Sequence, residues 1–299
     1  MLGTAALFWG FAFAFQTEGT RLLGPYSFNC IRMLIGALVV IIMALILGKT
    51  GFSKRPKTRE ERKRLWMIGG ACGFFLFLGS NLQQAAISLG ATAGKAGFLT
   101  AMYILIVPVI GIFFKRKPGW NVWIAVFIAT AGFYFLCING DFSFKLIDIL
   151  LLLCALAYSA QIMILDRWGP GVDSLWLSAV EFIVCGVLTL LPSLFLEIIP
   201  YKDGLSAYLS AFSNSDLWIC IMYMAIFSCG FGYTFQVIGQ REVDPTVASL
   251  LMSQESIFSA VAGWTLLNQK MSGRELIGCA LMCAALVLAQ LKFNKTKRI

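Results

Sequence analysis

Residues 244–267 read DPTVASLLMSQESIFSAVAGWTLL, a run long enough to cross a bilayer, because about 20 apolar residues at about 1.5 Å each span the hydrocarbon. Asp244 and Pro245 mark its start, since Asp caps free N–H groups and Pro is tolerated at the first helical position. Glu255 stands in the middle, where inserting a carboxyl costs about 2.5–3.5 kcal/mol. We therefore predict that Glu255 faces a polar cavity between helices; the alternative is that it only ties helices together.

The composition is that of a polytopic membrane protein. Of the 299 residues, 59% are hydrophobic and 13% are charged, whereas a soluble domain carries about 25% charge. The nine cysteines fall within or beside apolar segments without a Cys-x-x-Cys pair, so we expect free, buried thiols. The chain has no histidine, the commonest metal ligand and neutral-pH proton carrier. We therefore predict no metal and no cofactor, and any proton coupling must use carboxylates.

Apolar segments and basic loops predict the topology. Of the 24 Lys and Arg residues, 17 fall in loops or the tail on one side and six in loops on the other. Because Lys and Arg are enriched in cytoplasmic loops, we expect a multi-pass protein of the plasma membrane (a bacterial inner membrane) with both termini cytoplasmic. The net charge of +9 then indicates membrane anchoring rather than nucleic-acid binding. The ten segments expected to be membrane helices are 2–22, 26–47, 65–89, 92–114, 120–138, 146–168, 174–198, 217–240, 245–267 and 272–291.

The two halves of the chain are similar to each other. A shift of 152 residues lays 82–139 over 234–291 without a gap and places Gln84 on Gln236, and a shift of 149 places Arg32 on Glu181. We predict an all-α integral membrane protein whose ten transmembrane helices form two five-helix repeats, 1–140 and 141–299. Because five is odd, the second repeat is inverted. Inverted repeats are typical of secondary transporters, with the substrate bound near the midplane.

Three charged residues lie deep in the apolar segments: Arg32, Glu181 and Glu255. We expect Arg32 and Glu181 to form an ion pair, either for coupling or as a static tie, because pairing relieves desolvation. A few polar groups among aromatic residues usually line a small-molecule cavity; the alternative is interhelical hydrogen bonding worth about 0.6 kcal/mol per contact. The residues predicted to bind substrate are Trp9, Gln16, Asn81, Gln84, Thr100, Tyr103, Tyr158, Gln161, Tyr233, Gln236, Gln254 and Glu255.

Other residues carry smaller predictions. Gly69 and Gly73 are spaced to let two helices approach closely. Lys95 is expected to snorkel to the interface, the alternative being that it attracts an anionic substrate to the outer mouth. Pro108 frees a backbone carbonyl and is a candidate hinge.

A resemblance to a known family rests on motifs in both halves. Leu7-Phe8-Trp9-Gly10, Arg32 and Gln254-Glu255-Ser256-Ile257-Phe258 together resemble the EamA-type branch of the drug/metabolite transporter superfamily, as do Pro108 and the Asp-Pro pair at 244–245. The chain departs from the family pattern where Met33 follows Arg32, where Ser256 replaces Pro, and at Asn268-Gln269, where the family has Gly-Glu. The resemblance covers nearly the whole chain and implies a ten-helix inverted-repeat carrier of small metabolites, often an exporter of amino acids or related compounds.

These observations favour a secondary transporter that works by alternating access. A membrane-embedded enzyme acting on a lipid or prenyl substrate is the alternative, although such enzymes usually need an acidic metal-binding cluster or His at a membrane face. A channel would need a re-entrant filter or a ring of like residues, and ATP drive would need a Walker-type motif. The expected partners are a small-molecule substrate and membrane lipid; a homodimer is left open, and nucleic acid is not expected.

Overall fold

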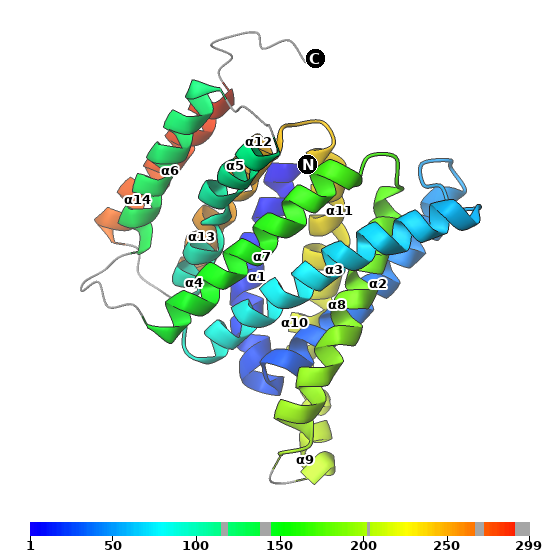
Figure 1. Cartoon of the computed structure of the whole chain (residues 1–299). Helices are drawn as coiled ribbons and strands as arrows, with labels where there is room; N and C mark the ends of the chain where they lie inside the picture. Colours follow the sequence, from blue (N-terminus) through cyan, green and yellow to red (C-terminus); the bar gives the residue numbers. More distant parts are fainter. Residues whose placement is uncertain (115–118, 138–144, 202–203, 267–271, 291–299) are drawn as a thin grey trace.

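The computed structural model describes residues 1–114, 119–137, 145–201, 204–266 and 272–290, and within these ranges the chain is helical, without a strand (Figure 1). The segments Asn268-Gln269, 115–118 and 291–299 and the predicted repeat boundary at 140 lie outside the described residues. The elements are α1 (Leu2–Leu23), α2 (Pro25–Gly48), α3 (Arg59–Ser88), α4 (Ala93–Thr100), α5 (Tyr103–Phe113), α6 (Trp120–Cys137), α7 (Leu146–Trp168), α8 (Ser174–Ser193), η1 (Leu194–Ile198), α9 (Gly204–Ser210), η2 (Ala211–Ser213), α10 (Ser215–Tyr223), η3 (Met224–Tyr233), α11 (Thr234–Gln240), α12 (Pro245–Met252), α13 (Glu255–Leu266) and α14 (Gly273–Gln290).

Six helical stretches are long and apolar enough to cross a membrane: Pro25–Gly48, Arg59–Ser88, Ala93–Phe113, Leu146–Trp168, Ser174–Ile198 and Ser215–Gln240. The other four predicted segments are also helical where the structure describes them, as α1, α6, α12 with α13, and α14. The sequence therefore predicted the class of fold correctly.

The start of α3 differs from the prediction. The helix predicted at 65–89 starts earlier in the structure, because residues 59–64 form the first turns of α3. Thr58 Oγ1 accepts a hydrogen bond from Glu61 N (3.1 Å), and the Glu61 carboxylate accepts one from Thr58 N (3.2 Å). This reciprocal capping box satisfies free backbone donors at the helix start, so the helix extends into the basic segment.

Two membrane segments are interrupted. The segment predicted at 92–114 breaks at Ala101–Met102 between α4 and α5, and the segment predicted at 245–267 breaks at Ser253–Gln254 between α12 and α13. At the second break the backbone bonds run to the residue three positions back, since Ser256 N donates to Ser253 O (3.2 Å) and Ile257 N to Gln254 O (3.0 Å). Ser253 Oγ and Ser256 Oγ also bond to backbone carbonyls there, although Ser249 and Ser259 do the same within α12 and α13 without a break. Glu255 is thus the first residue of α13 and not the middle of one continuous helix.

The helices approach one another closely at glycines. A Cβ on Gly10 would lie 2.2 Å from the Cβ of Phe258, so α1 packs on α13 almost backbone to backbone. A Cβ on Gly73 would lie 2.6 Å from Glu181 O, and one on Gly69 would meet Val180, which confirms the close contact predicted for this pair, with α8 as the partner. The α6 and α14 helices pack on each other at one side of the bundle (Figure 1).

Lys95 forms an ion pair, and most of the described cysteines are buried. Lys95 Nζ lies 2.6 Å from Asp148 Oδ1, so it joins the start of α4 to the start of α7 as an ion pair and is not a free cation at the outer mouth. The six described buried cysteines are free thiols as predicted, but Cys283 is exposed. Pro108 lies inside α5, after the break at Ala101–Met102, so it is not the point of interruption.

Candidate functional site

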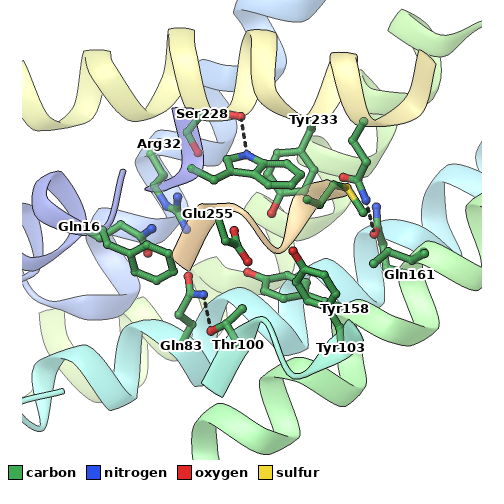
Figure 2. A pocket seen from close by; sticks show the side chains of 15 residues that line it. Gln16, Arg32, Gln83, Thr100, Tyr103, Tyr158, Gln161, Ser228, Tyr233 and Glu255 are labelled. Carbon is green, nitrogen blue, oxygen red and sulfur yellow. Dashed lines mark hydrogen bonds between the residues drawn. The ribbon is translucent and has the colours of Figure 1, made fainter. Parts of the chain in front are cut away.

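A small buried cavity lies where the two interrupted helices meet (Figure 2). Its volume is about 40 Å³. A water molecule needs roughly 10–15 Å³ by this kind of measure, so the space holds only a few waters. Its walls come from both halves of the chain: the lining residues are Trp9, Phe13, Gln16, Arg32, Gln83, Thr100, Tyr103, Tyr158, Gln161, Ile162, Ser228, Tyr233, Gln236, Met252 and Glu255.

The residue that follows each helix break lies at this cavity. Tyr103 begins α5 and Glu255 begins α13, and the Glu255 carboxyl points toward the Tyr103 ring (Figure 2). Both side chains are buried. Among the described residues, Glu255 Oε1 and the Tyr103 hydroxyl make no hydrogen bond of regular geometry, although the two side chains interact with each other. The Gln16 and Gln236 side-chain oxygens of the cavity also lack a partner. Buried polar atoms are normally well paired, so these groups are the features of the cavity most suited to a ligand.

Arg32 supplies the cation of the cavity. The side chain is 3% exposed, and its Nε donates to Asn29 Oδ1 (2.9 Å). Asn29 Nδ2 in turn donates to Ser80 Oγ (2.9 Å), which ties α2 to α3. No hydrogen bond from the terminal Nη atoms of Arg32 is found in the described part of the chain. The guanidinium is therefore held in place through Nε while its other donors remain available, because Arg carries five N–H donors.

Aromatic rings form one wall. The Trp9 and Tyr233 rings lie with their centroids 4.9 Å apart and tilted by 58°. Trp9 Nε1 donates to Ser228 O (3.2 Å), in the π-helical stretch η3 (Figure 2). Tyr233 also meets Phe182 edge to face, with centroids 5.3 Å apart. These contacts fix the ring positions, so Trp9 and Tyr233 present a rigid apolar surface beside the charged groups.

The predicted ion pair between Arg32 and Glu181 does not occur. Glu181 is fully buried outside the cavity, and its Oε1 accepts from Gln161 Nε2 (2.7 Å). Gln236 Nε2 donates to Gln161 Oε1 (3.1 Å), so an amide chain connects the cavity to Glu181. The prediction is wrong because each charged group finds a nearer neutral partner: Asn29 lies one helical turn before Arg32, and Gln161 reaches Glu181.

Three residues predicted to bind substrate do not line the cavity. Asn81 Nδ2 donates to Phe77 O and to Thr189 Oγ1 (both 2.8 Å), and Gln84 Nε2 donates to Thr20 Oγ1 (3.0 Å). The bond to Phe77 lies within α3, whereas those to Thr189 and Thr20 tie helices together, which is the alternative interpretation. Gln254 is buried in the break before α13.

The other nine predicted residues do line the cavity, and so does Arg32, which the sequence assigned to the ion pair. Sequence reasoning missed Phe13, Gln83, Ile162, Ser228 and Met252. Gln83 Nε2 donates to Thr100 Oγ1 (3.0 Å) at the cavity edge. A signal existed for Met252, because the 152-residue shift places it on the predicted residue Thr100.

Comparisons with known proteins agree over almost the whole chain. The EamA-like transporter family matches residues 1–138 and 145–291. An uncharacterized transporter of Archaeoglobus fulgidus is 24% identical over 97% of this chain and 85% of its own length. The uncharacterized transporter YoaV of Bacillus subtilis is 20% identical over 99% of this chain and 98% of its own. A solved crystal structure superposes with a TM-score of 0.74 at 18% identity, covering 97% of this chain and 95% of that one, which shows the shared fold.

Proposed function

Because this chain belongs to the EamA-like transporter family, we propose that it is a secondary active transporter that carries small metabolites across the plasma membrane by alternating access. The observation that carries the proposal is the cavity at the two helix breaks. Interrupted helices near the midplane, at the interface of two repeats, are where secondary transporters bind substrate. Membership in a transporter family favours this role over chemistry on a lipid or prenyl substrate.

The packing of the helices supports an architecture of ten membrane helices in two inverted repeats. A shift of 152 residues carries the break at Ala101–Met102 onto the break at Ser253–Gln254, and Tyr103 onto Glu255. Under the same repeat, α2 corresponds to α8 and α6 to α14, and these pairs pack on each other. The contacts of α3 with α7 and α8 are matched by those of η3 with α1 and α2. A two-fold axis between Tyr103 and Glu255 accounts for this pattern.

The size of the cavity supports alternating access. A space of about 40 Å³ cannot hold a metabolite, so substrate needs the halves to move apart on one side. Since seven lining residues belong to 1–140 and eight to 141–299, rocking of one half against the other opens or closes the same site. We place both termini in the cytoplasm, on the basis of the distribution of Lys and Arg.

The charges favour a zwitterionic substrate, and we propose export of amino acids or related compounds. Arg32 offers free guanidinium donors to a carboxylate, and Glu255 offers a carboxylate oxygen to an ammonium group or exchanges a proton with the substrate path. Trp9 and Tyr233 provide an apolar surface for the remainder of the molecule. Charge-assisted hydrogen bonds at both ends distinguish such a substrate from a neutral one.

Counterflow in liposomes tests this function. Purified protein is reconstituted with unlabelled compound inside, and uptake of the labelled compound is followed for a panel of amino acids, amines, carboxylates and sugars, against liposomes without protein. We expect transient accumulation of one or more zwitterions and less for the matched amine or carboxylate. Absence of counterflow for every compound contradicts the carrier proposal, and preference for sugars contradicts the assigned roles of Arg32 and Glu255.

A further inference from the structure

A second cavity lies at the end of the bundle that the basic loops predict to be cytoplasmic. Its volume is about 1010 Å³, far larger than that of the central cavity, and the two share no residue. It is lined by the end of α2, the link 49–58, the first turns of α3, the link before α8 with the start of α8, and the residue that follows α11. It lies at the ends of helices that are long and apolar enough to cross a membrane, where lipid head groups are expected.

Positive charge dominates this cavity. Its two acidic residues, Asp173 and Glu61, are already engaged: Asp173 accepts from Ser53 Oγ (3.0 Å) and Lys54 N (2.7 Å), and Glu61 accepts from Lys57 N (2.7 Å). In the described part of the chain, no ion pair joins either carboxylate to a basic residue of the cavity. The basic residues that line it are Lys49, Lys54, Arg55, Lys57, Arg64 and Arg241.

The three arginines are held in position by carbonyl and aromatic groups, and Arg241 also interacts electrostatically with Asp173. Arg64 Nη2 donates to Pro170 O (2.7 Å), and Arg241 Nη2 donates to Val172 O. The Arg55 guanidinium stacks over the Trp176 ring at 5.8 Å. Carbonyl and aromatic partners orient a guanidinium without neutralising it. The cavity is therefore a preformed cationic site, and Arg in such a position matches the geometry of phosphate.

An apolar surface continues from the cavity along α2. Leu45 lines the cavity and is 50% exposed. Leu38 and Ile42 are also exposed and precede Leu45 at spacings of seven and three residues, so the three side chains form one stripe on the helix. A ligand in this cavity thus meets cations at one end and an apolar stripe below it.

We propose that this cavity binds the head group of an anionic phospholipid of the same leaflet, with its acyl chains along the exposed stripe of α2. The cations alone would also accept a free phosphate group, but the adjoining stripe gives the amphiphile additional contacts. Basic pockets between transmembrane helices at the cytoplasmic side are suited to anionic head groups. The proposal needs only that the protein is inserted in a membrane, so it is independent of whether transport is found.

Native mass spectrometry of the detergent-purified full chain tests the proposal. The protein is titrated with phosphatidylglycerol and with phosphatidylcholine of the same acyl chains, and separately with inorganic phosphate. We expect one phosphatidylglycerol to bind at least tenfold more tightly than phosphatidylcholine. The triple variant K54Q/R55Q/K57Q should bind it roughly 100-fold more weakly, since each basic residue near the surface contributes about 1 kcal/mol.

The matched control removes three neighbouring charges that do not line the cavity. The variant R59Q/R62Q/K63Q has the same net charge as the first triple variant and should bind phosphatidylglycerol within about threefold of wild type. If the first variant does not fold, the single substitution Lys54→Gln keeps the backbone contact to Asp173 and should weaken binding roughly fivefold. Equal losses in the two triple variants, or no preference for phosphatidylglycerol, would overturn the proposal. If inorganic phosphate binds as tightly as phosphatidylglycerol, the ligand of this cavity is a free phosphate group and the lipid proposal is wrong.

Discussion

Replacing Glu255 with Gln should separate transport from folding. The substitution keeps the shape of the side chain and removes its charge. In the described residues Glu255 Oε1 makes no hydrogen bond of regular geometry, and the oxygen of a Gln side chain can keep the contact with Tyr103, so the thermal midpoint should change little. If Glu255 meets a substrate ammonium, the substitution leaves that charge buried and unpaired. Truncating one member of a buried charge pair costs about 2–5 kcal/mol, which corresponds to at least about a 30-fold loss of binding.

Glu181 provides the matched control for this experiment. It is also a buried carboxyl on a membrane helix, but it lies outside the cavity and accepts a hydrogen bond from Gln161. Glu181→Gln retains an amide oxygen that can still accept this bond, so transport should stay within about threefold of wild type. Counterflow of the best substrate is measured for both variants in the same liposomes, at two pH values. Wild-type rates and pH dependence in Glu255→Gln, or equal losses in both variants, would refute the assigned role of Glu255.

Three further predictions test topology, packing and the ion pair between Lys95 and Asp148. A cysteine introduced by Glu60→Cys in a cysteine-free background should not be labelled by a membrane-impermeant maleimide added to intact cells, because this position is predicted to be cytoplasmic. Strong labelling would contradict the predicted orientation. Gly10→Ala should lower stability by about 1–3 kcal/mol, because its Cβ would lie 2.2 Å from a Cβ of α13, whereas Gly3→Ala, with open space around it, should leave the thermal midpoint unchanged. A double-mutant cycle of Lys95→Gln and Asp148→Asn should give a coupling of about 0.2–1 kcal/mol, since the Lys95 side chain is 35% exposed; strict additivity contradicts the pair.

The positions of the helices could be predicted from the sequence, but the breaks could not. Apolar length and the Asp244-Pro245 start located the last interrupted segment well, because both are local properties of the chain. At the break, backbone hydrogen bonds run to the residue three positions back, from Ser256 N to Ser253 O and from Ile257 N to Gln254 O. Hydropathy carries no information about which carbonyl a backbone N–H bonds to, so the sequence predicted one continuous helix over 245–267.

The cavity-lining residues could not all be predicted, because the rotation of each helix about its own axis is not visible in the sequence. Gln83 and Gln84 are adjacent on α3, and one helical step of about 100° decides which of them reaches the cavity. Gln83 bonds to Thr100 at the cavity edge, whereas Gln84 turns to Thr20 on α1. The apolar pattern predicts how deep a residue lies along the helix but not toward which neighbour it turns. For Arg32 a local signal was available, since Asn29 precedes it by one turn and takes its Nε, yet the overlay with Glu181 suggested a distant partner instead.

The unbroken course of α3 joins the two cavities mechanically. Arg64 lines the basic cavity and Gln83 the central one, and both lie on this single helix, about 28 Å apart at about 1.5 Å per residue. A helix without a joint acts as a lever, so a tilt imposed at one end displaces the other. If lipid binds the basic cavity and substrate the central one, as proposed above, membrane composition at one face would bias the transport cycle, and thermodynamic reciprocity would require substrate to alter the affinity for lipid by the same factor.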